Sequence, residues 1–226
     1  MDKVNEFEHG IDTDTKARSD SLRFDKLSNE QFRYVSSDEL LKTETGKKSF
    51  RDMIEAFFNL QRKRLQVLAS YAQGDNYSIL AGSRRLDKEK ADYRVRHKWG
   101  GYISSFATSY VIGNPVTIGI LEGAEEDQLK IIEEIEWQND INSLNSDLAF
   151  DASVYGRAFE YHFRDKDNID RVVLISPLEM FVVRDLTVEQ NIICAVHLPI
   201  YNNRVNMTVY TSDQVIKYKP FTYYSP

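Results

Sequence analysis

Two short segments contain residues of the types that bind phosphate or calcium, but neither segment completes its motif. The segment TGKKS at residues 45–49 resembles the end of a phosphate-binding loop, which holds phosphate oxygens with backbone N–H groups and a Lys. Leu41 occupies the position where such a loop requires Gly, and no apolar strand precedes it. The segment DKDNID at residues 165–170 matches a calcium loop only at its first and third positions, and Ile169 stands at the fifth. We therefore expect a hairpin turn at 165–170, and neither a metal nor a cofactor.

Sets of residues for acid–base or nucleophilic catalysis are not recognisable either. No Ser stands in a G-x-S-x-G elbow, and the acidic pairs at 125–126 and 133–134 are adjacent residues, which diverge on a helix. The single cysteine, Cys194, lies in the apolar run IICAV, which favours a buried small hydrophobe over a nucleophile. The chain is predicted not to be an enzyme.

The histidines also lack the spacing of metal ligands on a helix. They are His9, His97, His162 and His197. His162 and His197 could meet across a sheet, although solvent-facing positions explain them better.

A basic cluster over residues 84–98 is the remaining candidate for binding. Its cations are Arg84, Arg85, Lys88, Lys90, Arg94, Arg96, His97 and Lys98, diluted by Asp87, Glu89 and Asp92. No interleaved aromatic residues or groove-reading motif accompany them, and the formal net charge of the chain is -6. A solvated connector or an intersubunit surface of ion pairs is therefore favoured over a nucleic-acid site.

The elements that would position these residues begin after a polar stretch. Residues 1–46 have too few apolar residues for a periodic face, which predicts a flexible arm, with a short helix over SDELLKT. Apolar residues at three- and four-residue steps then predict a helix over 49–72 that ends at Gly74.

A second helix follows the basic cluster and ends at a sharp turn. Its apolar stripe, which would build the body of the domain, holds Val95, Trp99, Ile103, Phe106 and Tyr110. Gly113 is expected to take the left-handed conformation that ends a helix. Pro115 biases Asn114 towards extended backbone, so the strand VTIGI at 116–120 is expected to follow at once.

The second half of the chain changes from helical to alternating periodicity. Helices are predicted within 124–156, the second of them ending at Gly156. Alternating and apolar runs then predict antiparallel strands over 157–219, separated by turn-rich segments. The expected fold class is α+β, with a helical region followed by an antiparallel β-meander.

Composition places the chain among folded proteins of a reducing compartment. Of its 226 residues, 42% are hydrophobic and 12% aromatic, and one cysteine permits no intrachain disulfide. No run approaches the roughly 20 apolar residues that span a bilayer, and MDKVNEFEHG is too polar for a signal peptide. We expect synthesis in a bacterial cytoplasm and no membrane.

Three segments, taken in order, resemble the portal protein family of tailed bacteriophages. They are LASYAQGDNYSIL, then DYRVRHKWGGYISSFATSYVIGNPVTIG, then DINSLNSDLAFDASVYGRAFEYHFRDKDNIDRVVLISPLEMFVVRD. The resemblance implies a structural subunit of a dodecameric ring at one capsid vertex of the virion, through which double-stranded DNA is packaged and ejected. It implies as partners other copies of the chain and the terminase, adaptor, scaffold and capsid proteins.

By the same resemblance, residues 47–113 are the helical part of the portal wing and residues 114–226 its α+β part. The same resemblance implies that the stem, clip and crown of the family are not part of this sequence. Two alternatives remain open: a nucleic-acid-processing or packaging accessory protein that uses residues 84–98, and a monomeric protein-binding module.

Overall fold

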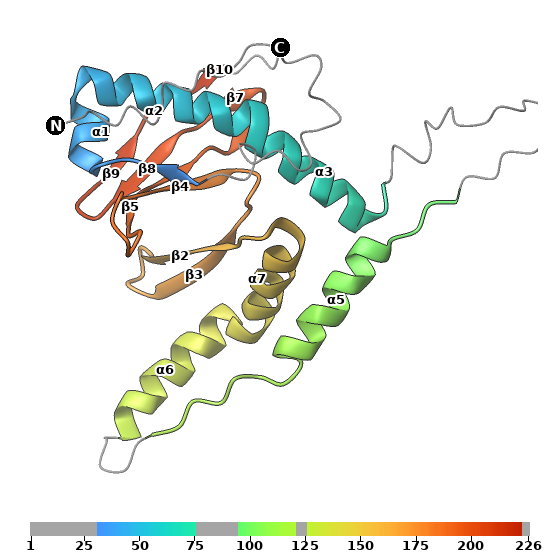
Figure 1. The fold of residues 1–226 in the computed structure, drawn as a ribbon. Helices are drawn as coiled ribbons and strands as arrows, with labels where there is room; N and C mark the ends of the chain where they lie inside the picture. Colours follow the sequence, from blue (N-terminus) through green and yellow to red (C-terminus); the bar gives the residue numbers. More distant parts are fainter. Residues whose placement is uncertain (1–30, 76–94, 121–125, 223–226) are drawn as a thin grey trace, which may run out of the picture. The chain divides into compact units, whose positions relative to one another are not determined.

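The chain divides into two compact units. The computed structural model describes residues 31–75, 95–120 and 126–222. The terminal unit contains Met1–Arg64 and Phe181–Pro226, and the central unit contains Leu65–Met180. The terminal unit is therefore built from two stretches of chain that are far apart in sequence (Figure 1).

The described part of the terminal unit begins with a two-residue strand and a series of helices. The strand is β1 (Phe32–Arg33), followed by α1 (Ser37–Lys42), α2 (Glu44–Ala56), a π-helical turn (Phe57–Gln61) and α3 (Arg62–Gln73), which continues into the central unit. Side-chain caps start the first two helices, because Ser36 Oγ accepts a hydrogen bond from Glu39 N at 3.2 Å and Thr43 Oγ1 accepts one from Gly46 N at 2.9 Å.

The expectation of a flexible arm is wrong for residues 32–46. These residues form β1, α1 and the start of α2, and Leu40 is completely buried. The short helix predicted over SDELLKT is confirmed as α1, and the predicted helix over 49–72 begins earlier, at Glu44. Residues 1–30 lie outside the described part of the chain.

A five-stranded sheet completes the terminal unit, in the order β1-β4-β5-β8-β9. Its later strands are β4 (Met180–Arg184), β5 (Ile192–His197), β8 (Thr208–Thr211) and β9 (Val215–Lys217). Strand β1 pairs in parallel with β4, with Phe32 opposite Val183, whereas β8 is antiparallel to both β5 and β9. Strands β6 (Ile200–Tyr201), β7 (Arg204–Val205) and β10 (Phe221–Thr222) form a small separate antiparallel sheet.

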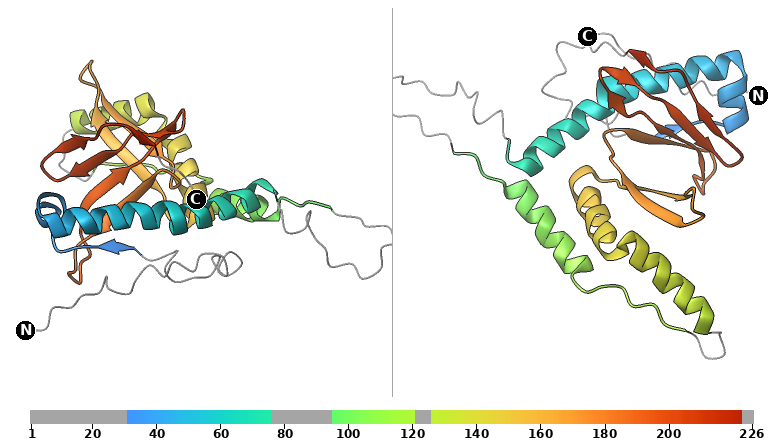
Figure 2. Two further views of the ribbon diagram at one scale, coloured as in Figure 1. Left: turned by 90° about the horizontal axis from the view of Figure 1, so that it is seen from above. Right: turned by 180° about the vertical axis from the view of Figure 1, so that it is seen from behind.

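The core of this unit lies between the sheet and α2 with its π-helical turn, which extend across the sheet (Figures 1 and 2). The Phe181 ring packs 4.9 Å from the Phe32 ring and 5.1 Å from the Phe57 ring, centroid to centroid. Leu40 and Val183 in the same cluster are completely buried. The N-terminal helices are thus anchored by residues more than a hundred positions later in the chain.

In its described residues, the central unit combines the end of α3 and three further helices with a β-hairpin. The helices are α5 (Trp99–Ile112), α6 (Glu126–Asn139) and α7 (Ile141–Tyr155), and the hairpin consists of β2 (Phe159–Arg164) and β3 (Asp170–Ile175). Helix α5 packs against α7, and both α6 and α7 contact β3. The expected strand VTIGI is wrong, because residues 116–120 are exposed and have no strand partner.

The expected α+β fold class is confirmed, although the strands do not form one continuous meander. The β2–β3 hairpin is a sheet of its own, and the remaining described strands divide between the other two sheets. The parallel strand β1 was not expected at all.

Candidate functional site

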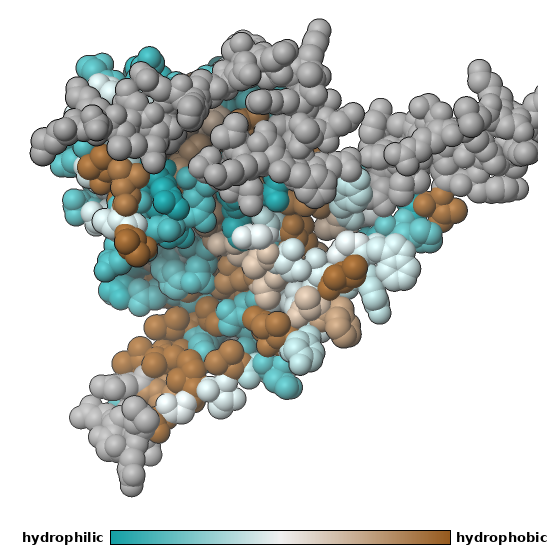
Figure 3. Space-filling model, viewed as in Figure 1, coloured by the Kyte–Doolittle hydropathy of each residue, from teal (hydrophilic) through white to brown (hydrophobic). Residues whose placement is uncertain are grey.

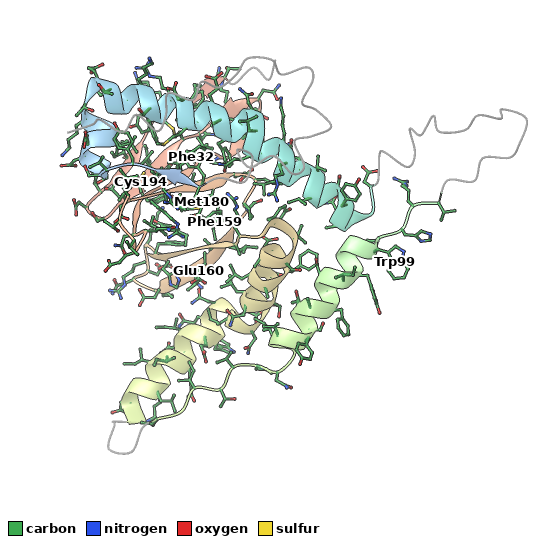
Figure 4. The ribbon with its side chains drawn as sticks, viewed as in Figure 1. Phe32, Trp99, Phe159, Glu160, Met180 and Cys194 are labelled. Atoms are coloured by element: carbon green, nitrogen blue, oxygen red, sulfur yellow. The ribbon has the colours of Figure 1, made fainter. Side chains whose placement is uncertain are left out.

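Reactive side chains do not gather in the described residues. Residues 31–75, 95–120 and 126–222 contain no group of three or more His, Cys, Asp or Glu that could hold a metal ion. His162 and His197 lie on strands of different sheets, and His162 is instead 3.1 Å from Glu160, between Nε2 and Oε1. Cys194 is buried in the terminal unit (Figure 4), and desolvation raises the pKa of its thiol to about 12. At neutral pH this thiol is protonated and unreactive.

The segment DKDNID forms the hairpin turn that its sequence predicts, between β2 and β3. Asp165 Oδ1 accepts hydrogen bonds from the backbone N–H groups of Asp167 at 2.9 Å and Ile169 at 3.0 Å. Asp165 Oδ2 accepts a bond from Arg171 Nε at 3.0 Å. The N–H of Ile169 and the side chain of Arg171 lower the pKa of Asp165. The carboxylate therefore organises the turn itself.

Asn139 fixes the elbow between α6 and α7 to this hairpin. Its Nδ2 donates to the carbonyl oxygens of Ile135 and Asp170, both at 2.9 Å, and its Oδ1 accepts from Val172 N at 3.0 Å. Asp140, which follows, has a φ of 46° and separates the two helices. Sequence reasoning missed this residue, although an Asn-Asp pair between two helical patterns is a recognisable turn signal.

The turn residues expected from sequence have different geometries. Gly156 ends α7 with a φ of 73°, and its N–H donates to the Ala152 carbonyl at 2.9 Å. The left-handed conformation expected for Gly113 is wrong, because its φ is -64° and its ψ is -22°. Gly113 is required for a steric reason instead, since an added Cβ would meet the carbonyl oxygen of Ser109. Asn114 and Pro115 follow as an exposed segment.

The structure places only part of the basic cluster. Arg84, Arg85 and Arg94 lie outside the described residues. Arg96 precedes α5, and its Nη1 lies 3.0 Å from Asp75 Oδ1 in an exposed ion pair. Lys98 is the N-terminal flanking residue of α5 and packs beside Gly74 and Gly101. The start of α5 is therefore basic, and Asp75 offsets part of that charge.

Helix α5 exposes its large apolar residues and buries its small ones. The aromatic stripe, as we call the exposed face of this helix, consists of Trp99, Tyr102, Ile103, Phe106 and Tyr110, which are 63%, 63%, 63%, 67% and 85% exposed. The opposite face buries Gly101 and Ser104, and Ser104 Oγ lies 3.1 Å from Ser153 Oγ of α7. Figure 4 shows Trp99 at the start of α5, with its side chain on the side away from α7.

The aromatic stripe departs from the expectation that this helix face builds the body of the domain. Small residues allow α5 and the end of α3 to approach closely, since a Cβ on Gly101 would meet the carbonyl oxygen of Ala72. The spacing of Gly101 and Ser104 on one helical face was the signal that could have identified the buried side.

Helix α6 presents a second exposed face with apolar residues. Trp137 is 83% exposed and Ile131 60% exposed. The α6 sequence EDQLKIIEEIEWQN holds five acidic residues and one basic residue, and Glu133 and Glu134 are exposed. In Figure 3 the strongly apolar side chains gather over α6 and the segment near it, whereas α5 is paler because Trp and Tyr have intermediate hydropathy. We call Ile131, Glu133, Glu134 and Trp137 the acidic face.

Comparisons with known proteins provide the identification that the geometry alone does not. None of the described helices combines the length and apolar character needed to cross a membrane. No curated protein matches the chain. Among protein families, the one described as "Phage portal protein, SPP1 Gp6-like" matches residues 6–223, which is nearly the whole sequence. The chain therefore belongs to the phage portal protein family.

Proposed function

We propose that this chain is a structural subunit of a ring at one vertex of a phage capsid, forming a channel through which DNA is packaged and later ejected. The family match over residues 6–223 carries this proposal. The ring has twelve subunits by the resemblance described above, and the DNA passes through it without being chemically changed. Residues 47–113 and 114–226 form the two parts of the wing.

The exposed surfaces of the central unit support a role in assembly. A soluble monomer rarely exposes an apolar patch larger than a few hundred Å². The aromatic stripe and the exposed Trp137 together present five large aromatic or aliphatic side chains on α5 and one on α6. Such residues are enriched where proteins bind one another.

The charge of the chain is consistent with a conduit for DNA. A formal net charge of -6 disfavours tight binding to the phosphate backbone, which would hinder movement. The partners in this proposal are other copies of the chain, double-stranded DNA, and the terminase, adaptor, scaffold and capsid proteins. The role needs no catalytic group and no cofactor.

The test is the mass of the purified chain in solution by light scattering over a wide range of concentrations, with negative-stain images of any large species. Ring-shaped particles of a fixed, high subunit number are expected. A strict monomer at every concentration would contradict ring formation by this chain and would favour the monomeric protein-binding module. Salt-sensitive DNA binding by the monomer would favour the accessory protein.

A further inference from the structure

The aromatic stripe is large enough to need a partner, although it is smaller than one side of a standard protein interface. An aromatic side chain buries roughly 150–250 Å², so the stripe, with the exposed fractions given above, offers about 600 Å². A standard interface buries about 800 Å² on each partner. In a ring, each copy buries a second surface against its other neighbour, which adds to the area that each copy buries.

The acidic face of α6 has the charge and the apolar residues to supply that surface. The aromatic stripe contains no charged residue, and it is preceded by Arg96 and Lys98. The acidic face combines Trp137 and Ile131 with the exposed carboxylates of Glu133 and Glu134. The basic start of α5 and the acidic face therefore carry opposite charges. Two described ion pairs lie near them, Arg96–Asp75 and Lys130–Asp127, but both are exposed and weak, so they do not cancel this charge complementarity.

We propose that the aromatic stripe of α5 in one copy of the chain packs against the acidic face of α6 in the next copy. The proposal rests on the proposed function as a ring subunit and names the surfaces that join neighbouring subunits. In this contact, the basic start of α5 in one copy lies near the C-terminal half of α6 in the next copy. Glu133, Glu134 and the negative end of the helix dipole attract cations there. Trp137 packs among the aromatic rings of the stripe.

Two different surfaces in contact make this interface heterologous. Each copy then uses its stripe towards one neighbour and its acidic face towards the other, which generates a ring when the rotation closes. The stripe contains no carboxylate, so a symmetric contact between two stripes would bring none from the stripe of the other copy to Arg96 or Lys98. It would also leave the acidic face uncovered and end at a dimer.

Cross-linking between variants of the full chain that each carry one added cysteine tests this arrangement. Ser105→Cys lies beside the aromatic stripe on an exposed position of α5, and Glu133→Cys lies on the acidic face. Native Cys194 is buried with a pKa of about 12, so it stays unreactive in the folded chain. Val188→Cys is the matched control, because this residue is 98% exposed and lies in the terminal unit.

The two variants carry tags of different size, are mixed and are treated with a short bis-maleimide. We expect cross-links between Ser105→Cys and Glu133→Cys chains, and none from either variant to itself or to Val188→Cys. A dominant link from Ser105→Cys to itself would overturn the proposal in favour of a symmetric contact.

Substitutions on the two surfaces provide an independent readout of self-association. Phe106→Ser and Trp137→Ser each remove a largely exposed ring, so folding is preserved, and each should weaken association at least about tenfold. Tyr201→Ser, at a 72% exposed position of the terminal unit, should leave association unchanged.

The outcomes separate this inference from the proposed function. Rings that form without the α5–α6 link and that tolerate both serine substitutions would overturn the inference and leave the ring subunit standing. A strict monomer would overturn both.

Discussion

Replacing Leu40 with Ala tests whether the N-terminal helices belong to the core of the terminal unit. Leu40 is completely buried on α1, in one cluster with Phe57, Phe181 and Val183. Ala lacks three of its carbon atoms, and at about 0.8 kcal/mol for each buried carbon the transfer cost is about 2.5 kcal/mol. The cavity left behind adds to this, because the neighbouring rings relax only partly. We expect Leu40→Ala to lower the free energy of unfolding by about 3 kcal/mol.

The assay is urea unfolding followed by far-UV circular dichroism at one low protein concentration, since self-association would add stability of its own. Val35→Ala is the control, because Val35 precedes the same helix and is 58% exposed, and its effect should stay within about 0.5 kcal/mol. Hydrogen exchange should show faster exchange in β4 and β5, which pack in the same core. A loss below about 1 kcal/mol for Leu40→Ala would refute the packing of α1 and restore the flexible arm over residues 32–46.

Three further changes test the turns of the central unit. Gly156→Ala should lower the free energy of unfolding in urea by about 1–2 kcal/mol, because the φ of this residue is 73°. An added Cβ meets no other atom there, so the cost comes from the backbone conformation alone. Gly119 is equally free of contacts and has no positive φ, so Gly119→Ala is the control and should cost almost nothing. Asn139→Ala should cost about 1–3 kcal/mol by the same measurement, because it leaves the part-buried backbone groups of Asp170 and Val172 in β3 without their side-chain partner. Asp165→Asn should lower the melting temperature at pH 7. The pKa of Asp165 is lowered, so the stabilisation from its carboxylate is present above the ordinary value of 3.8 and is lost as the pH falls below it. The melting temperatures of the variant and the native chain should therefore converge in acid. A difference between them that stays constant with pH would contradict the role of the carboxylate.

Local signals predicted the elements that depend on nearby residues. The Ser36–Glu39 cap and the first-turn acids of α1 are local, as are the apolar steps of α6 and α7 and the alternation of β2. The turn at 165–170 was likewise recognisable, because Asp165 makes its hydrogen bonds within the turn and its flanks. Each of these features is decided within a few residues of chain.

The missed features depend on distant residues. Strand β1 has only two residues, and its partner Val183 is far away in the sequence, so no local pattern announces it. The aromatic stripe shows a different limit, because helical periodicity identifies a face without saying whether that face packs inside the chain or remains exposed. The roles of Arg96 and Lys98 in contacts between copies of the chain are proposals.

The discontinuity of the terminal unit implies an order of events during synthesis. Its core combines Leu40, Phe50 and Phe57 with strands that begin only at Met180, whereas the central unit is one continuous stretch. A ribosome therefore releases α1 and α2 with their apolar faces uncovered, and the whole central unit emerges before their partners are made. The central unit can fold first, and the terminal unit must wait for its last strands. Until then the nascent chain displays an apolar helix face that is a natural target for chaperones.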